Sequence, residues 1–192
     1  MKSVLISICP KWCQKIISGE KTIEVRKTRP KPNPPFKCYI YCTRPKYEYE
    51  DFFVRDYPKP QFFGGGKVIG EFVCDDIFER IVQVGTSCEK PKYCLCDWNM
   101  DCTQLDGLLS DACLTLDELE KYLDGGVGYG WHISNLKIYD TPRELNNFRR
   151  ECKNNLWCES CAMYSEYRGT CGNASLQLRC SPQSWCYVEG GA

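Results

Sequence analysis

Short segments in which apolar and polar residues alternate, separated by clusters of proline and glycine, most strongly limit the folds open to this chain of 192 residues. The side chains of a strand point alternately to its two faces, so such segments predict strands with one buried face. Neither the proline cluster at 30–35 nor the glycine run at 64–66 continues a strand. The expected strands are residues 3–8, 22–27, 36–43, 67–74 and 131–139, with a strand or turn at 77–84.

Only short helices fit between these strands. A proline suits the first turn of a helix over residues 10–18, and another opens a helix over 142–150. Thr115 followed by Glu118 has the spacing of a capping box, which begins a helix. Few short helices among many strands favour an α+β or barrel architecture over a doubly wound sheet. The glycine runs lack the lysine and hydroxyl of a phosphate loop, so we expect no nucleoside triphosphate site.

The segment from residue 19 to residue 26 places three ionisable side chains on and beside one strand. Gly19 can end the preceding helix in the left-handed conformation, and Lys21 then stands at the start of the strand. The polar face of that strand carries a hydroxyl, a carboxylate and a guanidinium, from Thr22, Glu24 and Arg26. Such a cluster can read a base edge and a phosphate, or share a proton with a substrate. A solvated strand face with a surface ion pair fits the same spacing.

The pattern Gly-x-Lys-x-x-Glu-x-Arg, filled here by Gly19, Lys21, Glu24 and Arg26, resembles the ASCH domain (activating signal cointegrator homology). The resemblance implies an α+β fold, a PUA-like small β-barrel with short flanking helices, over residues 1–150. Residues 151–192 would then form a small metal-stabilised C-terminal segment. Together with the many cysteines, the resemblance suggests a protein of bacterial or phage type.

ASCH domains are thought to bind nucleic acid in a cleft between the barrel and its helices. The resemblance therefore implies that Lys21, Glu24 and Arg26 line a cleft for RNA or a modified nucleotide. To this set we add four residues from the sequence itself: Thr22, Arg44, Trp131 and His132. A histidine beside charged groups suits recognition of a base, although a lone histidine on a strand also occurs as a satisfied structural residue.

Some ASCH proteins are amidohydrolases that act on acetylcytidine through a lysine, a threonine and a glutamate of a later helix. Lys21 matches the lysine, whereas Glu24 occupies the threonine position and cannot act as a hydroxyl nucleophile. Glu118 or Glu120 would supply the later glutamate. Lys21 and Glu24 are the catalytic candidates if the protein is an amidohydrolase or a ribonuclease, but the departure at Glu24 favours binding without catalysis.

Charge is unevenly distributed along a chain whose formal net charge is zero. Residues 1–60 hold 13 Lys and Arg against 6 Asp and Glu, whereas residues 68–124 hold 4 against 13. Basic residues between 29 and 47, Arg44 among them, alternate with aromatic ones. This pattern suits phosphate contacts with base stacking, and an ordinary strand with a polar face fits it too.

The 16 cysteines are read as thiols or metal ligands of a cytoplasmic protein. Residues 1–8 resemble a strand rather than a signal peptide, and no run approaches about 18 apolar residues, so no contact with a membrane is expected. Five cysteines in helix or strand patterns are expected to be core residues, namely Cys9, Cys13, Cys38, Cys42 and Cys74.

The tail from residue 151 is rich in cysteine and poor in aliphatic residues. Cys158-x2-Cys161 has the spacing with which two thiolates hold one tetrahedral ion, and Cys171 and Cys186 are the chosen second pair for a structural zinc. Cys180 can replace either, and an iron–sulfur cluster or free thiols are the alternatives. Such a tail can also dock a protein partner. Residues 181–188 can return as a strand against the barrel, anchored by Trp185.

Overall fold

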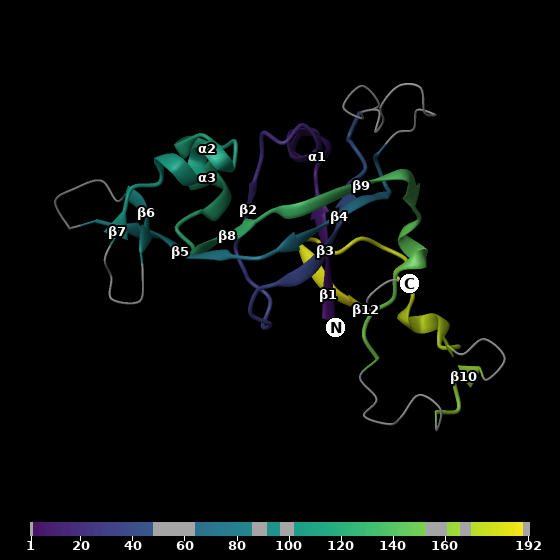
Figure 1. Cartoon of the computed structure of the whole chain (residues 1–192). Coiled ribbons are helices and arrows are strands. Elements are labelled where there is room, and N and C mark those ends of the chain that lie inside the picture. Colours follow the sequence, from purple (N-terminus) through teal and green to yellow (C-terminus); the bar gives the residue numbers. More distant parts are fainter. Residues whose placement is uncertain are drawn as a thin grey trace.

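The computed structural model describes residues 2–47, 64–85, 92–96, 102–152, 161–165 and 170–189. Two five-stranded sheets dominate this part of the chain (Figure 1). The first has the order β12-β1-β3-β4-β9, from Trp185–Glu189, Lys2–Ile8, Phe36–Cys42, Val68–Cys74 and Ser134–Arg143. The second has the order β2-β8-β5-β6-β7, from Ile23–Arg26, Gly128–His132, Ile77–Val84, Lys92–Cys96 and Cys102–Thr103.

Three short α-helices pack against these sheets. They are α1 (Pro10–Ile17), α2 (Asp106–Asp111) and α3 (Leu116–Leu123). The remaining elements are two turns of 3-10 helix, η2 (Leu145–Asn147) and η4 (Ala174–Leu176), and the pair β10 (Tyr164–Ser165) and β11 (Thr170–Cys171). None of the helices in the described ranges is long and apolar enough to cross a bilayer.

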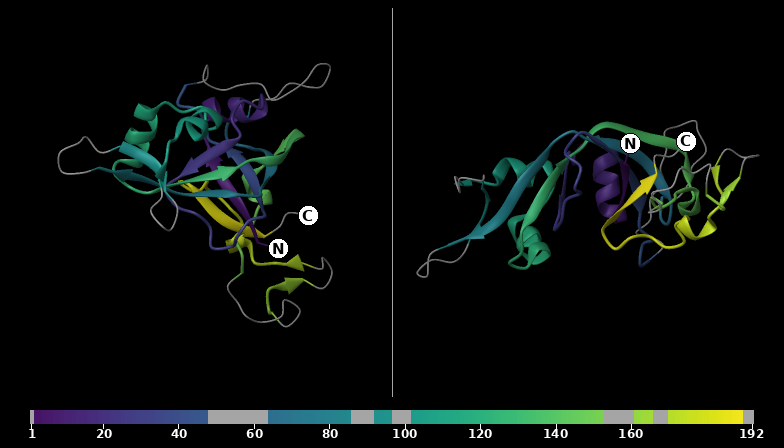
Figure 2. Two further views of the ribbon diagram at one scale, coloured as in Figure 1. Left: turned by 60° about the vertical axis from the view of Figure 1, so that its left-hand side comes forward. Right: turned by 90° about the horizontal axis from the view of Figure 1, so that it is seen from below.

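Two long β segments connect the sheets, because β4 continues into β5 and β8 continues into β9. Figures 1 and 2 show them side by side, passing from one sheet to the other. At the bend, Ile133 donates its N–H to the Thr22 carbonyl at 2.8 Å and His132 donates to Asp76 at 3.0 Å. The fold is thus mixed α+β, as the sequence predicts, and the chain bends strongly where it passes between the sheets. Within the described residues neither sheet closes on itself, so the predicted small barrel is present only as two open sheets.

Three apolar clusters form the core. One lies between α1 and a face of the first sheet and includes Trp131, which is fully buried. A second joins β2 and β5 to α2 and α3, with Ile23, Val25 and Leu119 among its members. The third covers the opposite face of the first sheet, where Tyr39 meets Phe148 with their ring centroids 4.9 Å apart. Each of the three clusters therefore includes residues from the strands of at least one of the two sheets.

Most predicted elements are confirmed. The capping box of α3 is present. The Thr115 hydroxyl accepts from the Glu118 N–H, and the Glu118 carboxylate accepts from the Thr115 N–H. The helix predicted over 142–150 is wrong, because β9 runs to Arg143 and only η2 follows. Since β9 is an edge strand, its proline removes no hydrogen bond that the sheet needs.

The cysteines follow the predictions in part. Among the five expected core cysteines, only Cys9 is exposed, and the other four are buried free thiols. Cys96 is disulfide-bonded, which corrects the expectation that the cysteines would be thiols or metal ligands. Its backbone lies opposite that of Cys102 in the β6–β7 register, so strand pairing brings two cysteine positions together there.

The end of the chain belongs to the first sheet. β12 pairs antiparallel with β1, with Lys2 opposite Glu189 and Ile6 opposite Trp185. The Trp185 ring packs against Trp131 at a centroid distance of 5.9 Å and donates its N–H to the Thr28 hydroxyl at 3.0 Å. The predicted returning strand with its tryptophan anchor is therefore present, and the last part of the 151–192 segment is continuous with the core of the 1–150 domain.

The carboxyl of Glu71, on β4, provides a test of what stabilises the first sheet. Burial alone would raise the pKa of its carboxyl, but hydrogen bonds from the Tyr139 hydroxyl at 2.6 Å and from Lys37 at 3.0 Å outweigh burial and lower that pKa. A lowered folded-state pKa contributes stability above the unfolded pKa, and this stability is lost as the pH falls through the folded value. We expect Tyr139→Phe to lower the free energy of unfolding by about 1–3 kcal/mol at pH 7.

Urea unfolding at pH 7 and pH 3 measures the effect. The loss caused by Tyr139→Phe should be smaller at pH 3, because the lowered pH protonates part or all of Glu71 and weakens its charge-assisted hydrogen bond. Tyr129→Phe is the matched control, because the Tyr129 hydroxyl has no hydrogen bond within the described residues. A loss that is equal at both pH values would contradict the role given to Glu71.

Candidate functional site

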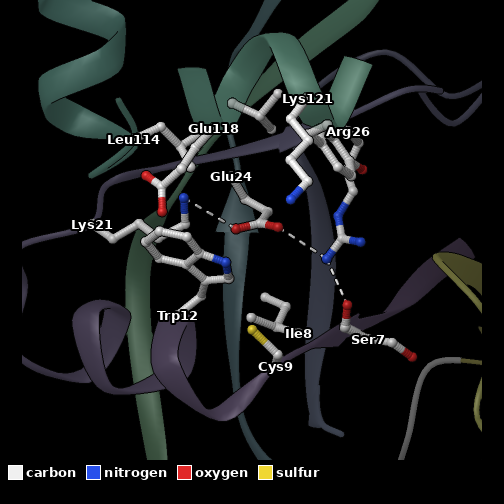
Figure 3. Close-up of a pocket in the computed structure, with 12 residues that line it drawn as sticks. Ser7, Ile8, Cys9, Trp12, Lys21, Glu24, Arg26, Leu114, Glu118 and Lys121 are labelled. Atoms are coloured by element: carbon white, nitrogen blue, oxygen red, sulfur yellow. Dashed lines mark hydrogen bonds and ion pairs between the residues drawn. The ribbon is translucent and has the colours of Figure 1, made fainter. Parts of the chain in front are cut away.

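A cavity of about 360 Å³ opens between the end of β1, the helix α1, the strand β2 and the helix α3 (Figure 3). Glu24 and Arg26 reach it from β2, and Lys21 reaches it from the turn before β2. Trp12 lines it from α1, and Lys121 from α3. The cavity thus lies where the two sheets and their helices meet.

Three buried ionic side chains form its floor, and Lys21, Glu24 and Arg26 are only 3%, 6% and 7% exposed. Glu24 lies between the two cations, with its Oε2 3.3 Å from Lys21 Nζ and its Oε1 3.0 Å from Arg26 Nη2. Among the described residues, Glu24 Oε2 has no hydrogen-bond partner. The carboxylate therefore keeps acceptor capacity at the cavity.

The local sequence explains the position of Lys21. Gly19, at a φ of 77°, ends α1 in the left-handed region that a residue without a β-carbon adopts readily. The Lys21 N–H then donates to the Lys15 carbonyl at 2.9 Å, which turns the chain back along the helix. Its ammonium donates to the Ala112 carbonyl at 2.7 Å and lies 5.1 Å from the centre of the Trp12 ring.

Arg26 is held by the first sheet and, through it, by the C-terminal segment. Its Nη2 donates to the Ser7 carbonyl at 2.6 Å. Ser7 in turn donates its hydroxyl to the Pro182 carbonyl at 2.7 Å and its N–H to the Ser184 carbonyl at 2.8 Å. The residues just before β12 thus fix the part of β1 that accepts from the guanidinium.

The mouth of the cavity carries further charges. Lys11 forms an ion pair with Glu118 at 3.0 Å and lies 4.2 Å from the centre of the Trp12 ring. The Thr115 N–H and Lys11 hold the pKa of Glu118 below its usual range, so this carboxyl is ionised at neutral pH. Lys121 forms no ion pair with any described residue, and Figure 3 shows its ammonium directed into the cavity.

Thiol chemistry is not favoured here. Cys9 lines the cavity, but desolvation raises the pKa of its thiol, so the thiolate that a nucleophile needs is disfavoured at neutral pH. His132, the one histidine in the sequence, does not line the cavity, and its Nδ1 lies 2.6 Å from Asp75 Oδ1.

Of the seven predicted ligand-binding residues, the structure brings Lys21, Glu24 and Arg26 together at the cavity. Thr22 adjoins them, but it does not line the cavity, and its backbone bonds to Asp111 of α2 and to Ile133 between β8 and β9. Trp131 lies opposite Glu24 in the β2–β8 register, yet it is fully buried against Phe36. The other two lie elsewhere: Arg44 lines a second cavity, and His132 lies at the bend between β8 and β9.

Sequence reasoning missed Trp12, Lys121 and Tyr122 as cavity residues. The capping box located α3 correctly, and Glu118, which it includes, was considered as a catalytic residue. Lys121 and Tyr122 follow three and four residues after Glu118, and such positions share a helix face. This spacing was the signal in the sequence that could have identified Lys121 and Tyr122. Nothing in the sequence alone indicated that α3 packs over β2.

The four cysteines predicted to bind zinc are placed incompletely. Cys158 lies outside the described residues, Cys161 and Cys171 lie near the β10–β11 pair, and Cys186 lies on β12. In the described ranges no three Cys, His, Asp or Glu side chains gather as metal ligands. The described cysteines therefore do not form a site on their own, and the tail zinc stays a prediction.

No protein-family model and no curated protein matches the chain. Among solved structures, it is similar to the ASCH protein of Zymomonas mobilis at 20% identity and a TM-score of 0.46, over 74% of this chain and 73% of that one. Two variants of that protein give TM-scores of 0.46 and 0.45 at 21% identity, over 76% and 74% of this chain and 77% and 74% of theirs. These proteins are named for the ASCH domain, the family that the motif at residues 19–26 resembles. A similarity of this extent assigns neither a ligand nor an activity.

The link from the C-terminal segment to Arg26 can be tested at Trp185. Trp185→Ala removes the ring that packs on Trp131 and the N–H that binds Thr28, and we expect the free energy of unfolding to fall by about 3 kcal/mol. The Ser7 amide should also exchange its hydrogen faster, because its acceptor, Ser184, precedes the weakened strand.

Urea unfolding and amide hydrogen exchange measure these two effects. Tyr187→Phe is the control on the same strand, since it removes only the hydroxyl that accepts from the Lys31 N–H. If Ser7 exchanges no faster in Trp185→Ala than in Tyr187→Phe, the strand does not hold β1 in the way described.

Proposed function

We propose that this cavity binds one nucleotide of a single-stranded nucleic acid, RNA in the first place, or a modified nucleotide, within an ASCH-type, PUA-like fold. One observation carries the proposal. The Glu24 carboxylate is buried between two cations, and its Oε2 has no hydrogen bond from the described residues. Oε2 has the ion pair with Lys21 but no well-aligned hydrogen bond, so it keeps acceptor capacity that a ligand with a donor group can use.

The chemistry of Glu24 suits the edge of a base. An ionised carboxylate only accepts hydrogen bonds, and the amino and imino groups of bases supply donors. Lys21 and Arg26 flank it and are themselves fixed by the carbonyls of Ala112 and Ser7. The floor is therefore rigid, as recognition of a specific donor requires.

The walls suit the other parts of a nucleotide. Trp12 and Tyr122 provide aromatic surface on which a base can stack. Lys121 provides a cation without an ion pair among the described residues, which suits a phosphate. Lysine and arginine outnumber glutamate among the lining residues, so a ligand with negative charge is favoured.

The size of the cavity favours an unpaired base. Its volume of about 360 Å³ lies at the lower end of the range of small-molecule sites, about 300–1,000 Å³. A base inside a duplex exposes only its groove edges, so only a base outside the stack can enter such a pocket.

Fluorescence anisotropy with a labelled pool of single-stranded RNA tests the proposal at two salt concentrations. Lys121→Ala should weaken binding and reduce the slope of log K against log salt by about 0.7, because one phosphate contact is lost. Lys21→Met should abolish binding at the floor. Lys15→Met is the matched control, since Lys15 lies on α1 outside the cavity and pairs with Glu20.

Thermal unfolding accompanies these titrations, because removing one partner of a buried ion pair costs about 3–5 kcal/mol of stability. Lys121→Ala avoids that cost, since Lys121 is exposed on α3. Absence of binding by the wild-type protein, or equal binding by wild type and a folded Lys121→Ala, would contradict the proposal.

A hydrolase is the second candidate, and the position of Glu118 favours it. The resemblance implies a lysine and a later glutamate in an acetylcytidine amidohydrolase, and Lys21 and Glu118 line the same cavity here while Glu120 does not. Its ionised carboxylate suits a general base that takes a proton from water as water adds to the amide carbon. Glu118 then gives that proton to the amide nitrogen as the C–N bond breaks, and acetate and the free amine leave.

Chromatography of acetylcytidine incubated with the protein tests this candidate. Turnover that is lost in both Lys21→Met and Glu118→Gln, but retained in Lys15→Met, would establish it. The threonine position is taken by Glu24, and Thr22 does not line the cavity, so we expect binding without turnover.

A further inference from the structure

A second cavity, of about 730 Å³, lies between the end of β3, the segment around η2 and residues 178–181 of the tail. Two guanidinium groups line it, Arg44 from the end of β3 and Arg179 from the tail. Neither has a hydrogen bond or ion pair with any described residue. Arg44 was predicted to bind the ligand together with Lys21, and it lines this second cavity instead.

Each wall that carries an arginine is fixed by the fold. The Thr43 N–H donates to the Ile8 carbonyl at 2.8 Å, which holds the chain just before Arg44. A β-carbon at Gly66 would lie 3.1 Å from Arg44 Cγ and Nε, so the glycine gives the arginine side chain its space. On the tail side, Leu178 is buried and Pro182 accepts from Ser7, so residues 179–181 are anchored at both ends.

The charge and donors of this cavity match an oxyanion. Its carboxylate, Glu144, is already paired with Lys67, so no carboxylate of the described residues pairs with the two arginines. The Thr43 and Ser181 hydroxyls and the Asn146 amide add neutral donors around them. Guanidinium groups with neutral donors are the usual partners of phosphate oxygens.

We propose that this second cavity binds a phosphate group between Arg44 and Arg179. The site is separate from the cavity at Lys21, and the inference does not rest on the proposed function. Ile8, whose carbonyl accepts from the Thr43 N–H, also lines the first cavity, and the phosphate of a nucleic-acid strand is one source of the group. A phosphorylated small molecule presents the same chemistry.

Titration of the isotope-labelled full chain with inorganic phosphate tests the site by NMR, with chloride at equal ionic strength as the reference. The Thr43 and Gly66 backbone amides and the Asn146 side-chain amide should shift with phosphate and not with chloride. In Arg44→Gln/Arg179→Gln, the half-saturating phosphate concentration should rise at least about tenfold. Arg150→Gln is the matched control, because Arg150 is exposed and lies outside the cavity.

Equal shifts in the double variant and the wild type, or equal effects of phosphate and chloride, would overturn the proposal. The single variants Arg44→Gln and Arg179→Gln, each expected to weaken binding by about threefold, supply the answer if the double variant does not fold. Lys21→Met should leave the phosphate response unchanged, so this proposal and the proposed function fail independently.

A short single-stranded RNA then identifies the source of the phosphate. If the RNA shifts the same three amides at a lower concentration than inorganic phosphate does, the group belongs to a strand. If inorganic phosphate acts at the lower concentration, a small phosphorylated molecule is the occupant. In both cases the shifts of the three amides should depend on Arg44 and Arg179.

Discussion

The buried contact of Glu24 with Lys21 and Arg26 is the interaction on which the rest of the structure depends. Charges removed from water are costly unless their partners and remaining donors are satisfied. Here the carbonyl of Ala112 receives the lysine and the carbonyl of Ser7 receives the arginine, so β1, β2 and the end of α2 must meet at one point. The bend of the sheets follows this requirement, because β2 has to face α1, α3 and the first sheet at once. The three charged side chains are therefore fixed by folding itself.

Local rules account for much of this arrangement. Alternation along 22–27 predicted which side chains of β2 are polar, and Gly19 and Thr115 predicted a helix end and a helix start. The sequence did not show which elements pack on which face. Trp131 is on the predicted strand and opposite Glu24, but its ring fills the core, because an indole gains more from burial between Phe36 and Trp185 than from exposure at the cavity. The position of Arg44 also depends on how the elements pack. Its aromatic neighbours in the sequence suggested a common site with Lys21, whereas the order of the strands places it at the second cavity.

The tail illustrates a second limit of sequence reasoning. Its cysteine content suggested a separate, metal-stabilised unit, and the described part shows a segment joined to the first sheet by a strand. Arg149 donates to the carbonyl of Asn173 at 2.7 Å, and Leu178 donates its N–H to Phe148 at 2.9 Å. Trp185 was the one residue whose type indicated this return, because a large aromatic residue in a polar tail needs a surface to cover. The described part of the tail therefore supports both cavities, because it accepts from Ser7 at the first and lines the second.

The pairing of β1 with β12 also has a consequence for biosynthesis. Among the described strands β1 is synthesised first and β12 last, so their contact closes the longest loop between paired strands of this structure. The strands from β2 to β9 can assemble before β12 is synthesised, because their partners lie between residues 2 and 143. During translation the sheets would thus form around a Ser7 that still lacks its acceptors. The part of β1 that holds Arg26 would gain this support only after residues 182–189 have been synthesised.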